Sequence, residues 1–172
     1  MPWSISIVAQ DVGPDGTHNM LVRSIPKRFD PDAFLTVSTR VAFDPTSNFQ
    51  FAGLMIGGAD PDVDRLQLGR SYCDVDVCAL GGLYFDRIES GNFVGDNYAL
   101  PFENAPGLLI QLAAREFSPG EWVVLGAYSF DGEDWIPAGE HFVDFEPQLV
   151  GLIAGQAPDE LLASFEFFEL EM

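Results

Sequence analysis

Acidic side chains alternate in one loop near the middle of the chain, where Asp60, Asp62 and Asp64 occupy every second position. Carboxylate oxygens on a loop are the hard ligands that Ca²⁺ prefers, so this loop is a candidate structural calcium site. It is not an EF-hand loop, because Arg65 and Ser71 stand where that loop requires its glycine and its final glutamate.

A second group of side chains, in the segment 84–98, has the mixture found in saccharide sites. A pyranose offers C–H faces to aromatic rings and pairs of hydroxyl groups to carboxylates, amides and guanidinium groups. The candidate ligand-binding residues are Tyr84, Asp86, Arg87, Asn92, Asn97 and Tyr98. The alternative is that Phe85 and Phe93 enter the core while the polar residues only solvate a long loop.

Nucleophilic catalysis lacks its usual residues. The chain holds two histidines, His18 and His141, and no Gly-x-Ser-x-Gly motif that would mark a serine nucleophile. His141 stands beside Phe142 in an alternating strand pattern, which favours a strand-surface or partly buried histidine. We therefore predict no catalytic residues.

The charge balance narrows the classes of partner. Asp and Glu number 27 against 8 Lys and Arg, so the formal net charge is −19. Phosphate backbones and anionic membranes repel such a surface, and no run of 18 apolar residues is present to span a bilayer. Neutral glycans, cations and basic proteins remain as partners.

The two cysteines bear on the compartment. Cys73 and Cys78 are separated by four residues, and a reversal of the chain between them would bring them close enough for a disulfide. Such a bridge indicates an oxidising environment, whereas the alternative is two reduced thiols. The disulfide therefore predicts an extracellular or cell-surface protein. Because the first residues lack the features of a signal peptide, either the leader is not present in this chain or export is absent.

Alternation of apolar and polar residues with a period of two organises most of the sequence. The segment 33–43 places Leu35, Val37 and Val41 on one face, as a half-buried strand requires. The segment 49–56 is apolar on both faces and predicts a central strand, with 64–70 as its hairpin partner. The later predicted strands are 83–88, 108–115, 121–130, 136–145, 149–155 and 164–171.

Many short strands separated by turn residues predict an all-β, antiparallel two-sheet sandwich, with residues 1–172 as one domain. One ambiguity concerns the segment 108–117, whose Leu, Ala and Glu content would also suit a helix. Another concerns Trp122, which alternates with Val124 and Tyr128 and could face either the core or the outside.

From about Asp30 onward, the order of motifs resembles a known family, the concanavalin A-like β-sandwich (jelly roll). This module forms the C-terminal part of bacterial β-xylosidases and related glycosidases, and also occurs in stand-alone domains. The motifs are VSTRVAFDPTSNFQFAGLMI (37–56), YSFDGEDW (128–135), PQLVGL (147–152) and FEFFEL (165–170). They are motifs of the fold: the second is a hairpin turn, similar to the Asp-box turns of sialidases, in which Gly132 takes a positive φ and Trp135 packs back over the strands.

The resemblance implies a non-catalytic role. Laminarinase-like relatives cleave glycosides with a Glu-x-Asp-x-(x)-Glu strand motif, which this chain lacks. We therefore predict a carbohydrate-binding or accessory module of a secreted or surface polysaccharide-active protein, with a neutral poly- or oligosaccharide as partner. The alternative is a structural or assembly subunit that associates with itself. Related sandwiches often carry a structural calcium ion, which adds to the interest of the acidic loop.

Overall fold

The structure is a computed structural model that describes residues 5–9, 19–26, 33–72, 82–94, 98–101, 107–155 and 161–172. Within these residues every regular element is a β-strand, and every pair of neighbouring strands is antiparallel. No helix in this part of the chain is long and apolar enough to cross a bilayer. The predicted all-β architecture with two antiparallel sheets is confirmed.

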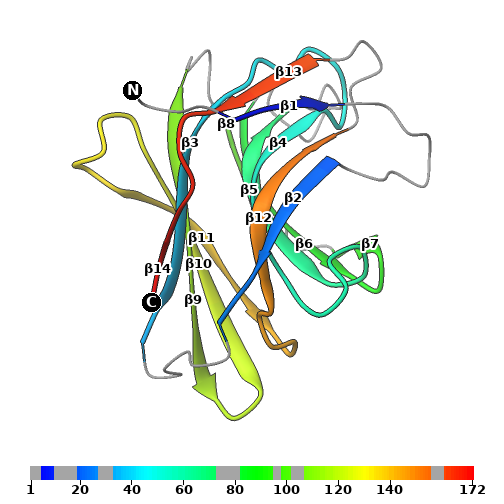
Figure 1. Cartoon of the computed structure of the whole chain (residues 1–172), viewed down its shortest axis with the longest axis vertical. Helices are drawn as coiled ribbons and strands as arrows, with labels where there is room; N and C mark the ends of the chain where they lie inside the picture. Colours follow the sequence, from blue (N-terminus) through cyan, green and yellow to red (C-terminus); the bar gives the residue numbers. More distant parts are fainter. Residues whose placement is uncertain are drawn as a thin grey trace.

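Two seven-stranded sheets face each other (Figure 1). In sheet A the strands follow the spatial order β1 (Ile5–Ala9), β13 (Leu161–Phe165), β3 (Leu35–Ala42), β9 (Leu108–Ser118), β10 (Glu121–Ser129) and β11 (Ile136–Val143), and β14 (Glu169–Glu171) also pairs with β3. In sheet B the order is β2 (Asn19–Ser24), β12 (Leu149–Gly155), β4 (Phe51–Gly57), β5 (Arg65–Ser71), β6 (Gly82–Glu89) and β7 (Asn92–Phe93), and β8 (Tyr98–Pro101) also pairs with β6.

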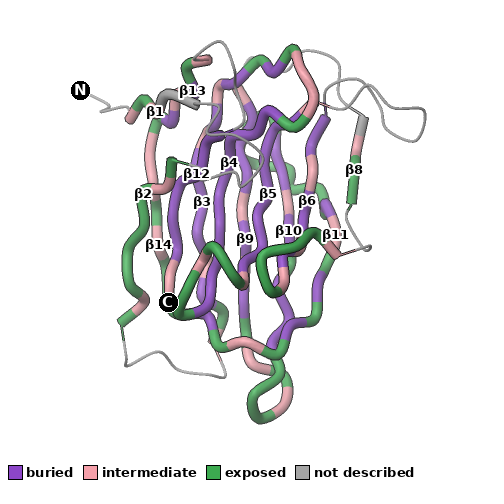
Figure 2. The backbone as a smooth tube through the Cα atoms, turned by 90° about the vertical axis from the view of Figure 1, so that its right-hand side faces the viewer, coloured by how far each residue is buried: buried purple, intermediate pink, exposed green. Residues whose placement is uncertain are grey.

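The main core lies between the two inner faces, where each sheet faces the other. Every second residue of β3, including Leu35, Val37 and Val41, enters this core, as the alternation predicted. Leu54 and Ile56 of β4 approach it from sheet B. The central strands are therefore buried along their length, whereas the loops and outer strands are exposed (Figure 2).

Sheet B is also buried on its outer face, which points away from sheet A. Phe51, Met55 and Ile153 form a second apolar cluster there, joined by the partly buried Met20 and Tyr84. This confirms that β4 is a central strand covered on both sides. The neighbouring β5 is the predicted hairpin partner of β4, and all seven of its residues are buried. Its polar side chains on the outer face satisfy one another by hydrogen bonds instead of facing water.

The C-terminal segment departs from its prediction as one strand over 164–171. The structure divides it into β13 and β14, which pair with different parts of β3. Between them, the backbone N–H of Glu166 donates to the carbonyl oxygen of Arg40, and the hydroxyl of Thr39 donates to the carbonyl oxygen of Phe167. The interruption lets one end of β3 pair with β13 and the other with β14.

The strand predicted at 108–115 is confirmed as part of β9. The segment 108–117 does not form a helix, because it lies between β3 and β10 and completes both of their ladders. Four short strands were not predicted: β1, β2, β7 and β8. Each is at the margin of its sheet, where burial imposes little periodicity on the sequence.

The hairpin turn at residues 129–135 has the predicted positive φ at Gly132, whereas Trp135, predicted to pack over the strands, is 37% exposed. Gly132 has φ +89°, in the region where a side chain would be strained. The carboxylate oxygen Oδ1 of Asp131 accepts hydrogen bonds from the hydroxyl of Ser129 and from the backbone N–H groups of Glu133 and Asp134, at 2.9–3.0 Å. The motif is thus a self-contained turn that joins β10 to β11.

Candidate ligand-binding site

A buried polar array occupies the outer face of sheet B. Arg65 and Gln67 alternate along β5, and Asp86 lies opposite Gln67 on β6. Nε of Arg65 donates to Oε1 of Gln67 (2.9 Å), and Nε2 of Gln67 donates to Oδ2 of Asp86 (3.1 Å). Nη1 of Arg65 also donates to the carbonyl oxygen of Pro61 (2.9 Å). The three side chains therefore form one hydrogen-bonded chain and are at most 6% exposed.

The electrostatics of the array follow from this burial. Loss of solvation raises the pKa of Asp86 to about 6, although the hydrogen bond from Gln67 and the charge of Arg65 act in the opposite direction. Burial also lowers the pKa of Arg65, against the influence of Asp62 and Asp86. Tyr84 lies two residues from Asp86 on the same face, and its pKa is raised by burial and by that carboxylate. The array is a structural network, because a ligand cannot reach its buried atoms.

The five described residues among the six predicted to form a saccharide site are not brought together on one face. Tyr84 and Asp86 share the outer face of sheet B. Arg87 lies on the other side of β6, the same side as Phe85, and forms an ion pair with Glu89. The side chain of Asn92 donates to the carbonyl oxygen of Ser90 (2.9 Å) within the turn after β6. Asn97 lies outside the described residues.

Tyr98, predicted as a ligand-binding residue, is 39% exposed and also packs against neighbouring rings. It pairs with Phe85 across β6 and β8, with their ring centroids 6.2 Å apart. His141 of β11 packs edge-on against both rings, at 4.4 Å from Phe85 and 5.1 Å from Tyr98. Nε2 of His141 also donates to the carbonyl oxygen of Phe85 (3.0 Å). His141 is buried at 2% exposure, so it links the two sheets.

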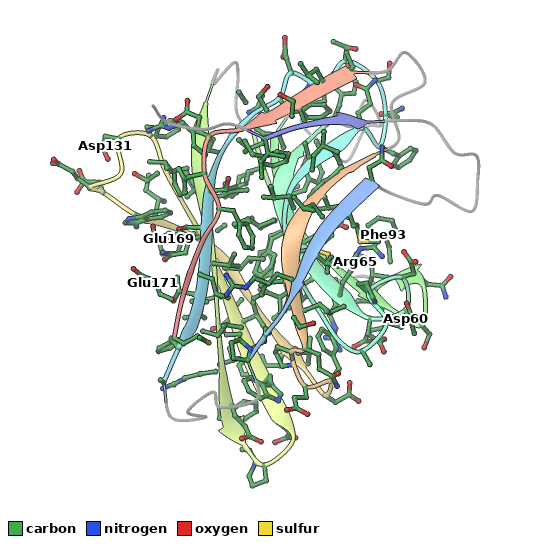
Figure 3. The ribbon with its side chains drawn as sticks, viewed as in Figure 1. Asp60, Arg65, Phe93, Asp131, Glu169 and Glu171 are labelled. Carbon is green, nitrogen blue, oxygen red and sulfur yellow. The ribbon has the colours of Figure 1, made fainter. Side chains whose placement is uncertain are left out.

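The acidic loop predicted to bind calcium is a hydrogen-bonded turn. Oδ1 of Asp60 accepts the N–H of Asp62 (3.1 Å), and Oδ1 of Asp64 accepts the N–H of Ser90 (3.1 Å). Figure 3 shows Asp60 on the surface near Arg65. Across the described ranges, no three His, Cys, Asp or Glu side chains are arranged to hold a metal ion, and these aspartates are no exception. Backbone N–H groups bind one oxygen each of Asp60 and Asp64, two of the three carboxylates that the prediction assigned to the ion.

A pocket of about 850 Å³ opens at one end of the sandwich. Trp122 lies at its inner end, and Glu116, Glu146 and Gln148 provide polar groups; the other lining residues are Ser24, Ile25, Pro26, Ala59, Pro147 and Leu149. Trp122 belongs to the core and is 6% exposed, which resolves the ambiguity about its direction in favour of the inside. We call this feature the end pocket.

Hydrogen bonds hold the walls of the end pocket in place. The N–H of Ile25 donates to the carbonyl oxygen of Gln148 (2.8 Å), and the N–H of Gln148 donates to that of Gly57 (2.9 Å). Glu116 lies opposite Trp122 across β9 and β10, next to a register shift, and one of its oxygens accepts the N–H of Gly120 (2.6 Å). The pocket thus presents an indole, two carboxylates and an amide on an ordered frame.

The end pocket had no signature in the sequence, apart from the open question about Trp122. Its walls come from the end of β2, the turn between β9 and β10, and the segment before β12. The end of β2 is far from the other two segments in the sequence, and the closing of the two sheets brings them together. The predicted disulfide cannot be placed in this frame, because Cys73 and Cys78 lie outside the described residues.

Comparisons with solved structures show where this fold occurs. A mutant of the GH43 protein BlXynB from Bacillus licheniformis aligns with a TM-score of 0.73 and 15% identity, over 97% of this chain and 32% of that one. The xylan β-1,4-xylosidase from Bacillus halodurans aligns with a TM-score of 0.73 and 16% identity, over 98% of this chain and 33% of that one. A functionally unknown protein from Saccharomyces cerevisiae aligns with a TM-score of 0.67 and 17% identity, over 98% of this chain and 87% of that one.

The chain therefore spans about a third of the length of the two bacterial proteins, and most of the yeast protein. No family model and no curated protein matches the sequence. At these identities the comparisons establish the fold, and they confirm the predicted resemblance to the β-sandwich module of β-xylosidases. Function has to be argued from the site itself.

Proposed function

We propose that this chain is a non-catalytic carbohydrate-binding module that binds a neutral oligosaccharide in the end pocket. The observation that carries the proposal is the composition of the pocket: Trp122 lies beside Glu116, Glu146 and Gln148. The carboxylates and the amide accept and donate hydrogen bonds to the hydroxyl groups of a sugar, and the indole of Trp122, which is 6% exposed, contributes an apolar part of the pocket wall. A volume of about 850 Å³ is within the range of small-ligand sites.

The charge of the pocket favours neutral sugars over acidic ones. Among the described residues, its lining includes two glutamates and no lysine or arginine, within a chain of net charge −19. A uronic acid or a sulfated sugar would bring a further negative charge against these carboxylates. Neutral pyranosides meet no such repulsion.

The two glutamates of the pocket do not form the pair that glycoside cleavage needs. A general acid requires a carboxyl group in apolar surroundings that keep it protonated. Glu146 is exposed to solvent, and Glu116 accepts a hydrogen bond from the backbone of Gly120. These positions support binding without hydrolysis, and a polysaccharide ligand would place the protein outside the cell or at its surface.

Isothermal titration with neutral xylo-, cello- and manno-oligosaccharides tests the proposal. Gln148→Ala and Glu146→Gln change exposed side chains of the pocket, so both variants should fold and bind at least about tenfold more weakly. Glu140→Gln is the matched control, because Glu140 is an exposed glutamate on β11 and does not line the pocket.

Two results would count against the proposal. The first is an absence of binding to every neutral oligosaccharide by the folded wild-type protein. The second is binding that Gln148→Ala, Glu146→Gln and Glu140→Gln affect equally, since a site elsewhere would then be responsible. Release of reducing sugar that Glu146→Gln abolishes would instead reveal a hydrolase.

A further inference from the structure

Strand β2 is an edge strand that lacks the usual protection against pairing. It is hydrogen-bonded to β12 on one side, and in the described part of the chain no strand pairs with its other side (Figure 2). Five of its six residues are exposed, including Leu21 at 52% and Val22 at 41%. Every second residue of such a strand directs its N–H and C=O away from the sheet. β2 therefore offers a row of backbone groups flanked by apolar side chains.

The opposite margin of the molecule, β11, has the protective features that β2 lacks. Pro137 has no N–H to donate, Glu140 places a charge on the strand, and a register shift between Gly126 and Ala127 disturbs its ladder with β10. β2 contains no proline and no acidic residue, and its single charged side chain is Arg23. In a chain with 27 acidic residues, this edge is unusually free of repulsion.

From these features we propose that two copies of this chain associate through antiparallel pairing of their β2 strands. In an antiparallel pair, side chains directly opposite each other lie on the same face of the sheet. A two-fold axis that pairs a strand with its own copy must therefore pass through one residue and not between two. An axis through Leu21 places it opposite its own copy, Met20 opposite Val22, and Asn19 opposite Arg23. The register about Val22 instead places Leu21 opposite Arg23.

The register about Leu21 is the one that matches side chains of the same character, and it extends both apolar layers of the sandwich. Leu21 pairs with Leu152, whose side chain is in the main core, and Met20 packs against the outer-face cluster of Phe51 and Met55. A second copy would thus continue sheet B across the axis and cover Leu21 and Val22. This interface specifies the self-association that the sequence left open, and it does not depend on the saccharide site.

Sedimentation velocity over a series of protein concentrations tests the proposal. We expect the wild type to shift from monomer to dimer as concentration rises, and Leu21→Lys to weaken the dimer at least about tenfold, because two like charges then meet on the axis. Val22→Lys should act in the same direction. Leu162→Lys is the matched control, since Leu162 is similarly exposed, at 56%, and its strand β13 belongs to the other sheet.

A charge swap distinguishes pairing from a general effect of charge. A mixture of Leu21→Lys and Leu21→Asp should form a heterodimer at low ionic strength, while Leu21→Lys alone stays monomeric. Thermal unfolding of each variant shows that it is folded. The proposal is wrong if the wild type remains monomeric at the highest concentration, if both β2 lysine variants dimerise as the wild type does, or if Leu162→Lys dissociates the dimer to the same extent.

Discussion

Nε2 of Gln67 on β5 donates a hydrogen bond to Oδ2 of Asp86 on β6, with 3.1 Å between the two atoms. Both side chains are buried, at 1% and 6% exposure. Arg65 donates to the other end of the same amide. A charged carboxyl group is therefore held in the outer layer of sheet B by one amide and one nearby guanidinium, and its ionisation is coupled to folding.

The pH dependence of stability should reveal this coupling. The pKa of Asp86 is about 6 in the folded protein, above its ordinary value of 3.8, so the folded state binds more protons between these pH values. The contribution of Asp86 to the free energy of unfolding is then greatest below pH 3.8. It falls by up to about 3 kcal/mol as the pH rises through about 6. Asp86→Asn should remove this part of the slope in urea unfolding at a series of pH values. A slope identical to that of the wild type would contradict the assignment.

The pH dependence of stability that arises from Asp131, in the hairpin turn at 129–135, should have the opposite sign to that from Asp86. Three hydrogen bonds to its ionised carboxylate hold the pKa of Asp131 below its ordinary value, with the backbone N–H groups of Asp134 and Glu133 as the leading causes. The stabilisation is present above the unfolded pKa and is lost as the pH falls through the folded one. Asp131→Ala should lower the melting temperature at neutral pH, and this difference should shrink in acid. Glu133→Ala, an exposed change in the same turn, is the control.

Gly126 and Phe85 test the contact between the sheets. A Cβ atom on Gly126 would lie 2.9 Å from two carbon atoms of the Phe85 ring. Gly126→Ala should therefore cost about 1–3 kcal/mol in the free energy of unfolding. Adding Phe85→Leu to this variant should cost less than Phe85→Leu costs alone, since the methyl group then occupies part of the space of the ring. Additive losses in the double-mutant cycle would show that the two residues do not share that space.

Arg70 and Arg65 should respond differently to the same substitution. Nε and Nη1 of Arg70 are buried and have no hydrogen-bond partner in the described part of the chain, whereas Arg65 donates to Gln67 and Pro61. Arg70→Met removes polar atoms whose desolvation is not offset, so stability should be unchanged or higher. Arg65→Met leaves Asp86 without its nearby cation and should cost about 3 kcal/mol or more at pH 8. Urea unfolding of both variants makes the comparison, and an equal loss would contradict it.

Much of the fold could be predicted, because burial imposes a local pattern. Strand β3 alternates, β4 is apolar on both faces, and both signals are contained within about eight consecutive residues. The turn at 129–135 was predictable for the same reason, since its hydrogen bonds join neighbours in the sequence. The edge strand β2 was not, because its exposed residues carry no alternation of polarity.

The candidate sites were harder to predict. Tyr84 and Asp86 share a face because they are two residues apart in a strand. Tyr98 belongs to another strand, β8, and its pairing with Phe85 places it on the same face of sheet B as Phe85, opposite to that of Tyr84 and Asp86. Composition indicated the right residue types for a sugar site but not that Asp86 is buried with Gln67.

By itself, the sequence determined the class of fold and the position of most strands, since both follow from local alternation and turn chemistry. It also determined the acidic character that disfavours nucleic acids and anionic membranes. Tertiary structure alone decided that Asp64 accepts the N–H of Ser90, and that Trp122 joins Glu146 in one pocket. These relationships depend on which distant segments meet when the sheets close, and no local pattern encodes that meeting.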